Sequence, residues 1–288
     1  MRHAVRRLLC LLVLAPVLAL GTASPAAAVL TQGIGVAELP GPLRIPGLPR
    51  LSPPGSNDFT CRPTAAKPYP VVLVHGTFGD SFVSWQSLSP MLAGDGYCVF
   101  ALDYGLRGTG PIEKSAAQLR DFVDRVLSAT GATKVSIVGH SQGGMMPRYY
   151  LRFLGGAAKV DELIGLAPSN HGTTNPLTPP PGSSLCPACA QQAAGSAFLT
   201  NLNAGRDVEP GVDYTVLSTR YDEVVTPYRS QYLTGPAEQV TNITLQAKCR
   251  LDLTDHNFII YDPAALQWVE HALLRDGPAS PSFRPFCL

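Results

Sequence analysis

Short, uninterrupted apolar runs recur along this chain and predict β-strands. Four runs cover residues 71–74, 97–102, 135–138 and 163–167, and two later strands fit residues 214–218 and 243–247. An apolar run without polar alternation is typical of a strand buried on both faces, as in a parallel sheet. Regular structure is therefore expected to begin near Tyr69 and to be built around one central sheet.

Between two of these runs, apolar positions recur at helical spacing. They are Leu119, Phe122, Val123, Val126 and Leu127. Pro111 stands near the start of this pattern and Gly131 just past its end, which predicts a capped amphipathic helix. Further helices are expected over residues 144–154 and about 263–274. Strands that alternate with helices predict an α/β fold with a mostly parallel sheet covered by helices on both faces.

Two stretches depart from this alternation. Residues 29–67 are rich in proline and show no sustained periodicity, which predicts an extended segment lying over the domain. Residues of about 170–207 contain Pro179-Pro180-Pro181 and much Ala, Ser and Gly, which predicts a small cap or excursion over the carboxyl edge of the sheet. The main domain is expected to cover residues 68–288.

The first 28 residues have the features of a cleaved signal peptide. Basic residues that include Arg6 and Arg7 precede an apolar run over residues 8–20, and small residues end at Ala28. A run of this length is short for a helix that spans a bilayer. We therefore expect export of a mature chain without a stable membrane span, and an extracellular location.

Composition narrows the classes of partner. The 288 residues are 45% hydrophobic and carry 22 Lys and Arg against 21 Asp and Glu, for a formal net charge of +1. The hydrophobic content is that of a globular protein and exceeds that of a disordered tail. Balanced charge provides no basic face for nucleic acid, so we expect no nucleic-acid partner.

Six of the seven cysteines lie outside the signal peptide, since only Cys10 falls within it. An even number in an exported chain indicates disulfides, although six cysteines allow fifteen pairings. Nearness in sequence favours Cys186 with Cys189 and leaves Cys249 to tether Cys287, with Cys61 and Cys98 as the remaining pair. Redox catalysis by Cys186 and Cys189 is the alternative, but their place in a Pro-rich loop favours a structural staple.

The segment Gly139-His140-Ser141-Gln142-Gly143 carries the strongest chemical signal. It lies between a predicted strand and a predicted helix, so Ser141 would occupy the sharp turn that exposes a nucleophile. The start of the helix would direct N–H groups and its positive dipole end at negative charge that develops beside the serine. Pro147 is expected to kink this helix near its start.

A nucleophilic serine needs a histidine base and an acid that orients the histidine. In this arrangement the base follows the acid late in the chain, which disfavours His75 and His140, and His171 and His271 fall in the cap and in a helix. His256 follows the predicted strand over residues 243–247 and is the expected base.

The expected acid is Asp222, which stands just beyond the strand over residues 214–218. Glu223, Asp252 and Asp255 are the alternatives. Donors to an oxyanion are expected from the N–H groups of Gln142 and Thr77, with Phe78 in reserve for Thr77.

At these residues the chain resembles the secreted actinobacterial lipases of the lipase class 2 group, within the α/β-hydrolase superfamily. The resemblance covers most of residues 69–258 and is strongest at 74–79, 139–145, 222–227 and 255–256. The yeast lipase of the B type is similar at the same places, and its threonine that supplies oxyanion donors corresponds to Thr77. The elbow departs from that relative, since His140 stands where it has tryptophan. The resemblance implies hydrolysis of carboxylic esters, typically triacylglycerols, without a cofactor.

The sequence thus predicts a secreted serine hydrolase, most simply a triacylglycerol lipase that forms an acyl-enzyme on Ser141. Its partner would be a lipid or small ester, met at a lipid–water interface, with Phe78 as a candidate substrate contact and with no metal or other cofactor. A short-chain carboxylesterase, a polyesterase or an acyltransferase would use the same triad, and a peptidase fits the fold. A non-catalytic binding module is the alternative from another class.

Overall fold

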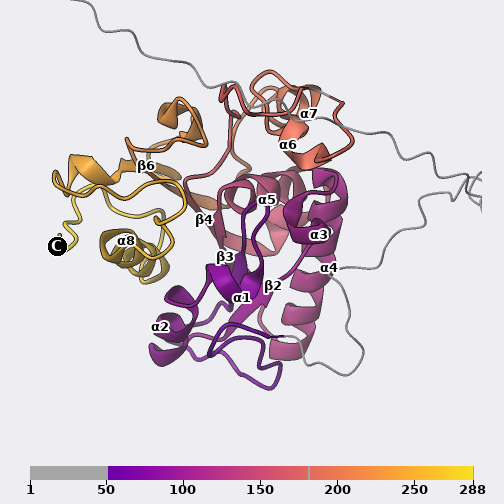
Figure 1. Ribbon diagram of the computed structural model, residues 1–288. Coiled ribbons are helices and arrows are strands. Elements are labelled where there is room, and N and C mark those ends of the chain that lie inside the picture. Colours follow the sequence, from indigo (N-terminus) through magenta and orange to yellow (C-terminus); the bar gives the residue numbers. More distant parts are fainter. Residues whose placement is uncertain (1–50, 181, 288) are drawn as a thin grey trace, which may run out of the picture. The chain divides into compact units, whose positions relative to one another are not determined.

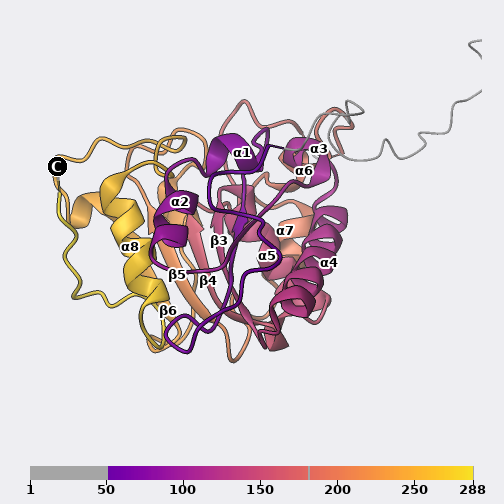
Figure 2. The same ribbon diagram turned by 90° about the horizontal axis from the view of Figure 1, so that it is seen from below.

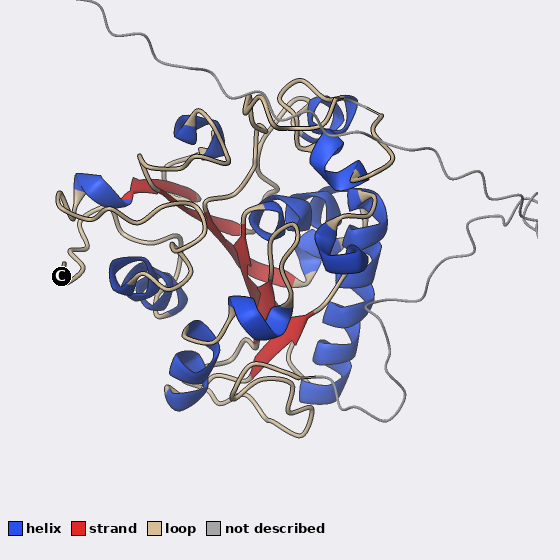
Figure 3. Cartoon of the chain, viewed as in Figure 1, coloured by secondary structure: helices blue, strands red, loops and turns tan. Residues whose placement is uncertain are grey.

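A single parallel sheet organises the part of the chain that the computed structural model describes, residues 51–180 and 182–287. Its strands are β1 (Val71–Val74), β2 (Val99–Leu102), β3 (Val135–His140), β4 (Val160–Leu166), β5 (Asp213–Ser218) and β6 (Val240–Thr244). The order is β2-β1-β3-β4-β5-β6, and every neighbouring pair is parallel. Figure 3 shows the strands in red, together in one sheet. The predicted α/β class is confirmed.

Helices connect the strands and cover both faces of the sheet (Figure 2). They are α1 (Ser81–Ser84), α2 (Leu88–Gly94), α3 (Gly105–Gly108), α4 (Ile112–Thr130), α5 (Gln142–Phe153), α6 (Pro187–Gln191), α7 (Ala197–Leu202) and α8 (Pro263–Leu273). Short 3₁₀ turns occupy Gly156–Ala158, Tyr228–Gln231 and Leu245–Ala247. The predicted excursion at 170–207 carries α6 and α7 (Figure 1).

Strand β1 shows how the two faces are built. Val72 and Val74 point into a core shared with α4, α5 and α7, while Val71 and Leu73 point into a second core shared with α2 and α8. All four valine and leucine side chains are fully buried. Burial of such a side chain contributes roughly 1.5–3 kcal/mol, so a strand apolar on both faces is stable only between two helical layers.

The long helix α4 begins and ends where the sequence predicts. Pro111 is its N-cap residue, and Gly131 ends it in the left-handed region with φ +75°, donating its N–H to the Leu127 carbonyl at 2.9 Å. The left-handed conformation favours glycine because a Cβ would clash there. Leu119 and Val123 lie on the buried face of the helix.

The last strand differs from the prediction. Residues 243–247 were expected to form it, but β6 ends at Thr244, and Leu245–Ala247 is a 3₁₀ turn. The apolar pattern misplaced the strand by three residues because β6 is an edge strand with polar positions. Its exposed Asn242 donates to the Leu233 carbonyl at 2.8 Å and accepts from the Leu233 N–H at 2.9 Å, which covers the open edge.

Smaller differences occur in the other elements. Strand β2 begins at Val99 rather than residue 97, and β4 begins at Val160 rather than residue 163. Helix α5 begins at Gln142 rather than residue 144, and Pro147 lies inside it, as predicted.

The opposite edge of the sheet is covered by the Pro-rich segment, of which residues 51–67 are described. Asn57 donates its backbone N–H to Val99, and its side chain both accepts from and donates to the backbone of Ala101, at 2.9 and 3.1 Å. These bonds continue the sheet beyond β2. Residues 1–28, where the signal peptide is predicted, and residues 29–50 lie outside the described part.

Three disulfides join the pairs expected from the sequence: Cys61–Cys98, Cys186–Cys189 and Cys249–Cys287. The first ties the Pro-rich segment to the start of β2, and the third ties the C-terminal segment to the turn after β6. No helix within residues 51–287 combines the length and the apolar character needed to cross a bilayer.

We predict that the Cys61→Ala/Cys98→Ala double variant is less stable than the wild type by about 2–4 kcal/mol, because the bond closes a loop of 37 residues. The matched control, Cys186→Ala/Cys189→Ala, opens a separation of 3 residues and should lose clearly less on this account. Urea denaturation followed by circular dichroism measures both free energies of unfolding. Equal losses in the two variants would contradict the loop-closure argument.

Candidate active site

Ser141 lies at the tight turn between β3 and α5. Its backbone has φ +54° and ψ −122°, a region that non-glycine residues rarely adopt. The two glycines around it permit this turn. A Cβ on Gly139 would lie 1.8 Å from the Gly143 carbonyl oxygen, and a Cβ on Gly143 would lie 2.1 Å from the carbonyl oxygen of Val74. Only glycine at both positions lets the strand, the turn and the helix approach so closely.

His256 and Asp222 are brought together by the loops that follow β6 and β5. The Nδ1 atom of His256 lies 2.8 Å from Oδ2 of Asp222, and neither side chain is more than 3% exposed. A proton on Nδ1 is therefore donated to the carboxylate, and Nε2 keeps its lone pair. This tautomer lets His256 act as a base through Nε2.

The carboxylate of Asp222 is held by four donors. Oδ1 accepts the N–H groups of Val224 and Val225 at 2.9 and 2.7 Å, and Oδ2 accepts Nε2 of Gln231 at 2.7 Å in addition to His256. Hydrogen bonds from fixed donors stabilise a buried carboxylate and restrict its rotation. Asp222 is thus a rigid partner for the imidazole.

The three alternative acids have other roles. The Asp252 carboxylate accepts the N–H of Thr254, and the Asp255 carboxylate accepts the N–H groups of the two loop residues 257 and 258. Glu223 contacts the backbone N–H of His256 at 3.5 Å but not its ring. The contacts of Asp252 and Asp255 are local turn bonds and that of Glu223 joins two loops, so Asp222 is the carboxylate paired with the imidazole.

The acid loop and the histidine loop are fastened to each other. Tyr221 forms a parallel bridge with Asp255, and the Thr219 hydroxyl donates to the carbonyl of Thr254 at 2.5 Å. Both loops leave the carboxyl edge of the sheet, so their distance from each other is set by the register of β5 against β6.

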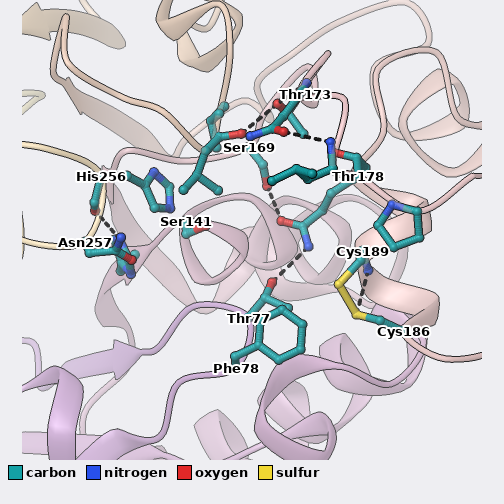
Figure 4. A pocket seen from close by; sticks show the side chains of 17 residues that line it. Thr77, Phe78, Ser141, Ser169, Thr173, Thr178, Cys186, Cys189, His256 and Asn257 are labelled. Carbon is teal, nitrogen blue, oxygen red and sulfur yellow. Dashed lines mark hydrogen bonds between the residues drawn. A yellow bond between two sulfur atoms is a disulfide. The ribbon is translucent and has the colours of Figure 1, made fainter. Parts of the chain in front are cut away.

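Ser141, Thr77, Phe78 and His256 line one cavity of about 410 Å³ (Figure 4). Its apolar lining includes Leu177, Pro179, Val224 and Val225, and its polar lining includes Ser169, Thr173, Asn175, Thr178, Gln192 and Asn257. Phe78, the candidate substrate contact, is 63% exposed at this cavity. Ser141 and His256 thus border the same cavity.

The backbone N–H groups predicted to bind an oxyanion differ in whether they already donate a hydrogen bond within the protein. Within residues 51–287, neither the Thr77 N–H nor the Gln142 N–H has a backbone acceptor, and Gln142 is the first residue of α5. The Phe78 N–H, the reserve donor, is taken by the Arg107 carbonyl at 2.7 Å. Thr77 lines the cavity, so its N–H can serve a ligand there, and the Gln142 N–H directly follows Ser141 in the chain, whereas the Phe78 N–H is already engaged.

Arg107 fastens the loop that carries Thr77, a role that sequence reasoning missed. Its Nε and Nη2 atoms donate to the Phe78 carbonyl at 3.0 and 2.7 Å, and its Nη1 lies 3.1 Å from the Asp80 carboxylate. Arg107 and Phe78 both have positive φ, at +60° and +63°. No local sequence pattern marks this contact, because the two residues are 29 positions apart.

His140 was disfavoured as the base, and the structure gives it another role. Its Nε2 atom is 2.8 Å from the carbonyl oxygen of His256, so it fixes the backbone of the histidine loop. Burial, together with the nearby His256, lowers the pKa of His140 to about 3. His75 is fully buried and stacks on Tyr104, and burial lowers its pKa too.

His171 and His271, also disfavoured, lie apart from the serine. His171 contacts Asp207 and the carbonyl of Ser230, while His271 stacks on Phe283. Within residues 51–180 and 182–287, no group of three or more His, Cys, Asp or Glu side chains is arranged to hold a metal ion.

Comparison with known proteins adds a family and a fold. A family model described as Lipase (class 2) matches residues 68–269. A triacylglycerol lipase of Pseudarthrobacter phenanthrenivorans is 41% identical over 91 residues, 30% of this chain and 28% of that protein. A triacylglycerol lipase of Vibrio cholerae is 36% identical over 85 residues, 28% of this chain and 27% of that protein. The matched stretch thus spans less than a third of these relatives.

Solved structures share the architecture at low identity. The lipase B of Aspergillus fumigatus superposes with a TM-score of 0.69 at 22% identity, covering 87% of this chain and 63% of the other. The mature lipase BlEst2 of Bacillus licheniformis gives 0.54 at 20% identity, over 69% and 89% of the two chains. At such identities the likeness shows the fold alone, and it confirms the predicted α/β-hydrolase fold.

We predict that stability falls as the pH falls below 6.5. An unfolded His140 titrates near 6.5 and the folded one near 3, so between these values the unfolded state binds an extra proton. The stabilisation is complete above 6.5 and is lost progressively toward pH 3, by about 2 kcal/mol between pH 7.5 and pH 5. His75 adds in the same direction.

Urea denaturation at several pH values measures this effect, and His140→Gln is the informative variant because it removes the titrating ring. The variant should lose less stability than the wild type between pH 7.5 and pH 5. An unchanged pH dependence in His140→Gln would show that His140 does not titrate as described.

Proposed function

The chain belongs to the lipase (class 2) family, and we propose that it is a secreted triacylglycerol lipase whose nucleophile is Ser141. The observation that carries this proposal is the 2.8 Å contact between His256 and Asp222 at the cavity that Ser141 lines. A base held in one tautomer beside a serine on a strained elbow is the arrangement that acyl transfer requires.

In the proposed reaction, Nε2 of His256 takes the proton of the Ser141 hydroxyl as Oγ attacks the carbonyl carbon of the ester. The resulting tetrahedral oxyanion accepts hydrogen bonds from the N–H groups of Thr77 and Gln142. The C–O bond to the alcohol then breaks, and the alcohol leaves with the proton from His256. Asp222 stabilises the imidazolium that forms in between.

The acyl-enzyme is released by the same groups in reverse roles. His256 takes a proton from a water molecule, whose oxygen attacks the acyl carbon, and then returns the proton to Oγ of Ser141. A carboxylic acid leaves and the free serine is restored. The overall reaction is hydrolysis of the ester, and the groups that take part are side chains, backbone N–H groups and water.

Two observations support the proposed secretion. Residues 1–28 have the pattern of a signal peptide, and all six cysteines beyond it are paired. Disulfides form and persist in oxidising compartments outside the cytoplasm. Detection of a mature chain that begins at Val29 in the culture medium would test this part of the proposal.

A short-chain carboxylesterase is the second candidate, and the cavity lining favours it. Ten of the 17 residues that line the cavity are polar, and Leu177 is 88% exposed rather than packed against other side chains. Hydrolysis of p-nitrophenyl esters from C2 to C16 and of emulsified trioctanoin separates the two candidates. Turnover of long chains and of the emulsion supports the lipase, and reaction with short esters alone supports the carboxylesterase.

We predict that Ser141→Ala, His256→Ala and Asp222→Asn each lower kcat for p-nitrophenyl esters by about 10³-fold or more without loss of the fold. The asparagine variant keeps the shape of the acid but removes the charge that holds the imidazole tautomer. Initial rates, with circular dichroism as the check on folding, measure this. Near wild-type activity in any folded variant would refute the role assigned to that residue.

Arg107→Ala should lower kcat by about 10-fold and change KM little, because it frees the loop that carries a proposed oxyanion donor. The effect on stability should be small, since the side chain is 58% exposed. Arg120→Ala is a suitable control, because Arg120 pairs with its neighbour Asp121 on α4. An unchanged kcat in Arg107→Ala would contradict the role of Arg107 in holding the loop that carries Thr77.

A further inference from the structure

Two glutamine side chains converge on the hydroxyl of Thr77. Nε2 of Gln142 donates to Oγ1 of Thr77 at 2.8 Å, and Nε2 of Gln192 donates to the same oxygen at 2.9 Å. Gln142 is the residue after the serine, and Gln192 ends the short helix α6 of the excursion. Three segments that are far apart in sequence therefore meet at one oxygen atom.

The orientation of the Gln192 amide is set by its other partners. Its Nε2 also donates to the Ala188 carbonyl at 3.1 Å, and its Oε1 accepts the Ser169 hydroxyl at 2.8 Å. In Figure 4, the dashed lines that leave Thr77 and Ser169 are the two hydrogen bonds that the Gln192 amide forms with other side chains. A rotated amide would place its oxygen against the carbonyl oxygen of Ala188, which is unfavourable. Gln192 must therefore donate to Thr77.

The Gln142 amide is set in the same way, since its Nε2 also donates to the Gly108 carbonyl at 2.6 Å. A hydroxyl oxygen has two lone pairs, and both lone pairs on Thr77 are then occupied by N–H donors. The hydroxyl hydrogen has no acceptor among residues 51–287, and Thr77 lines the cavity together with Ser141. The hydrogen is available to a ligand in that cavity.

We propose that Gln192 is a positioning residue that keeps the Thr77 hydroxyl directed at the oxyanion of the tetrahedral intermediate. This inference rests on the proposed function. The hydroxyl, already turned toward the place where charge develops, needs no reorientation at the moment of reaction. Without Gln192 one lone pair is free, and the hydroxyl rotates among several partners.

The excursion holds Gln192 firmly enough for this role. Gln192 is 8% exposed, and its N–H donates to Ala188 and Cys189 at 3.0 and 3.2 Å. The N–H of Ala188 in turn donates to the carbonyl of Thr109, and the disulfide Cys186–Cys189 closes the same turn. Through Gln192 the excursion is bonded to the loop that carries Thr77, and its residues line the cavity that Ser141 also lines.

The test begins with Gln192→Met, which keeps the size of the side chain and removes its donors. We expect kcat for a p-nitrophenyl ester to fall about 10-fold while KM stays within a factor of about two, since the hydroxyl acts on the intermediate rather than on the bound ester. Affinity for a phenylboronic acid, which forms a tetrahedral adduct, should fall in parallel with kcat.

The matched control is Gln191→Met. Gln191 is the neighbouring residue on α6, and it bonds to the Ile112 N–H and to Glu113 rather than to Thr77. The Gln191→Met substitution should loosen α6 without turning the Thr77 hydroxyl, so kcat should stay within about two-fold of the wild type. An equal fall in both variants would mean that Gln192 only supports the excursion, and the inference would be wrong.

A double-variant cycle gives the decisive result. Thr77→Val removes the hydroxyl, so Gln192→Met should have no further effect in that background, whereas in Thr77→Ser the roughly 10-fold effect should remain. If the effects of Thr77→Val and Gln192→Met multiply, Gln192 does not act through the hydroxyl. Failure of the proposed function is distinct: in that case the folded wild type would not hydrolyse the esters, or Ser141→Ala would keep wild-type activity.

Discussion

The site depends on one constraint, the forced turn at Ser141. Strand β3 and helix α5 approach so closely that the turn between them has a positive φ, and glycine is required on both sides, at 139 and 143. The strain is tolerated because the strand is fixed between two cores and the helix packs on the sheet. The same geometry places the serine at the cavity and leaves the first N–H of the helix without a backbone acceptor. The proposed nucleophile and the proposed oxyanion donor thus have a common structural cause.

Polar contacts between loops hold the histidine loop and the loop of Thr77 in place around that turn. His140 bonds to the backbone of His256, Gln142 bonds to Thr77, and Arg107 clamps the loop in which Thr77 lies. These contacts join segments that leave different strands at one edge of the sheet. These hydrogen bonds hold the groups before a substrate arrives, which is the condition for electrostatic stabilisation of a transition state. The excursion takes part in this network through Gln192.

Local patterns were sufficient for much of the architecture. The six predicted strands overlap the six observed ones, and the contact between His256 and Asp222 followed from their positions after successive strands. The edge strand β6 was misplaced because its polar exposed side carries no apolar run. Arg107, Gln192 and the role of His140 could not be found, since each acts through a contact with a residue distant in sequence. Such contacts leave no periodic or spacing signal in a single chain.

The central claim is that Ser141 is the nucleophile that His256 activates. The most direct measurement is intact-mass and peptide-mass spectrometry after treatment with diethyl p-nitrophenyl phosphate, which phosphorylates an activated serine and releases p-nitrophenol. The account predicts one diethylphosphoryl group on Ser141, formed in step with the loss of esterase activity and at a far lower rate in His256→Ala. Loss of activity with Ser141 unmodified, or with the label on another residue, would contradict it.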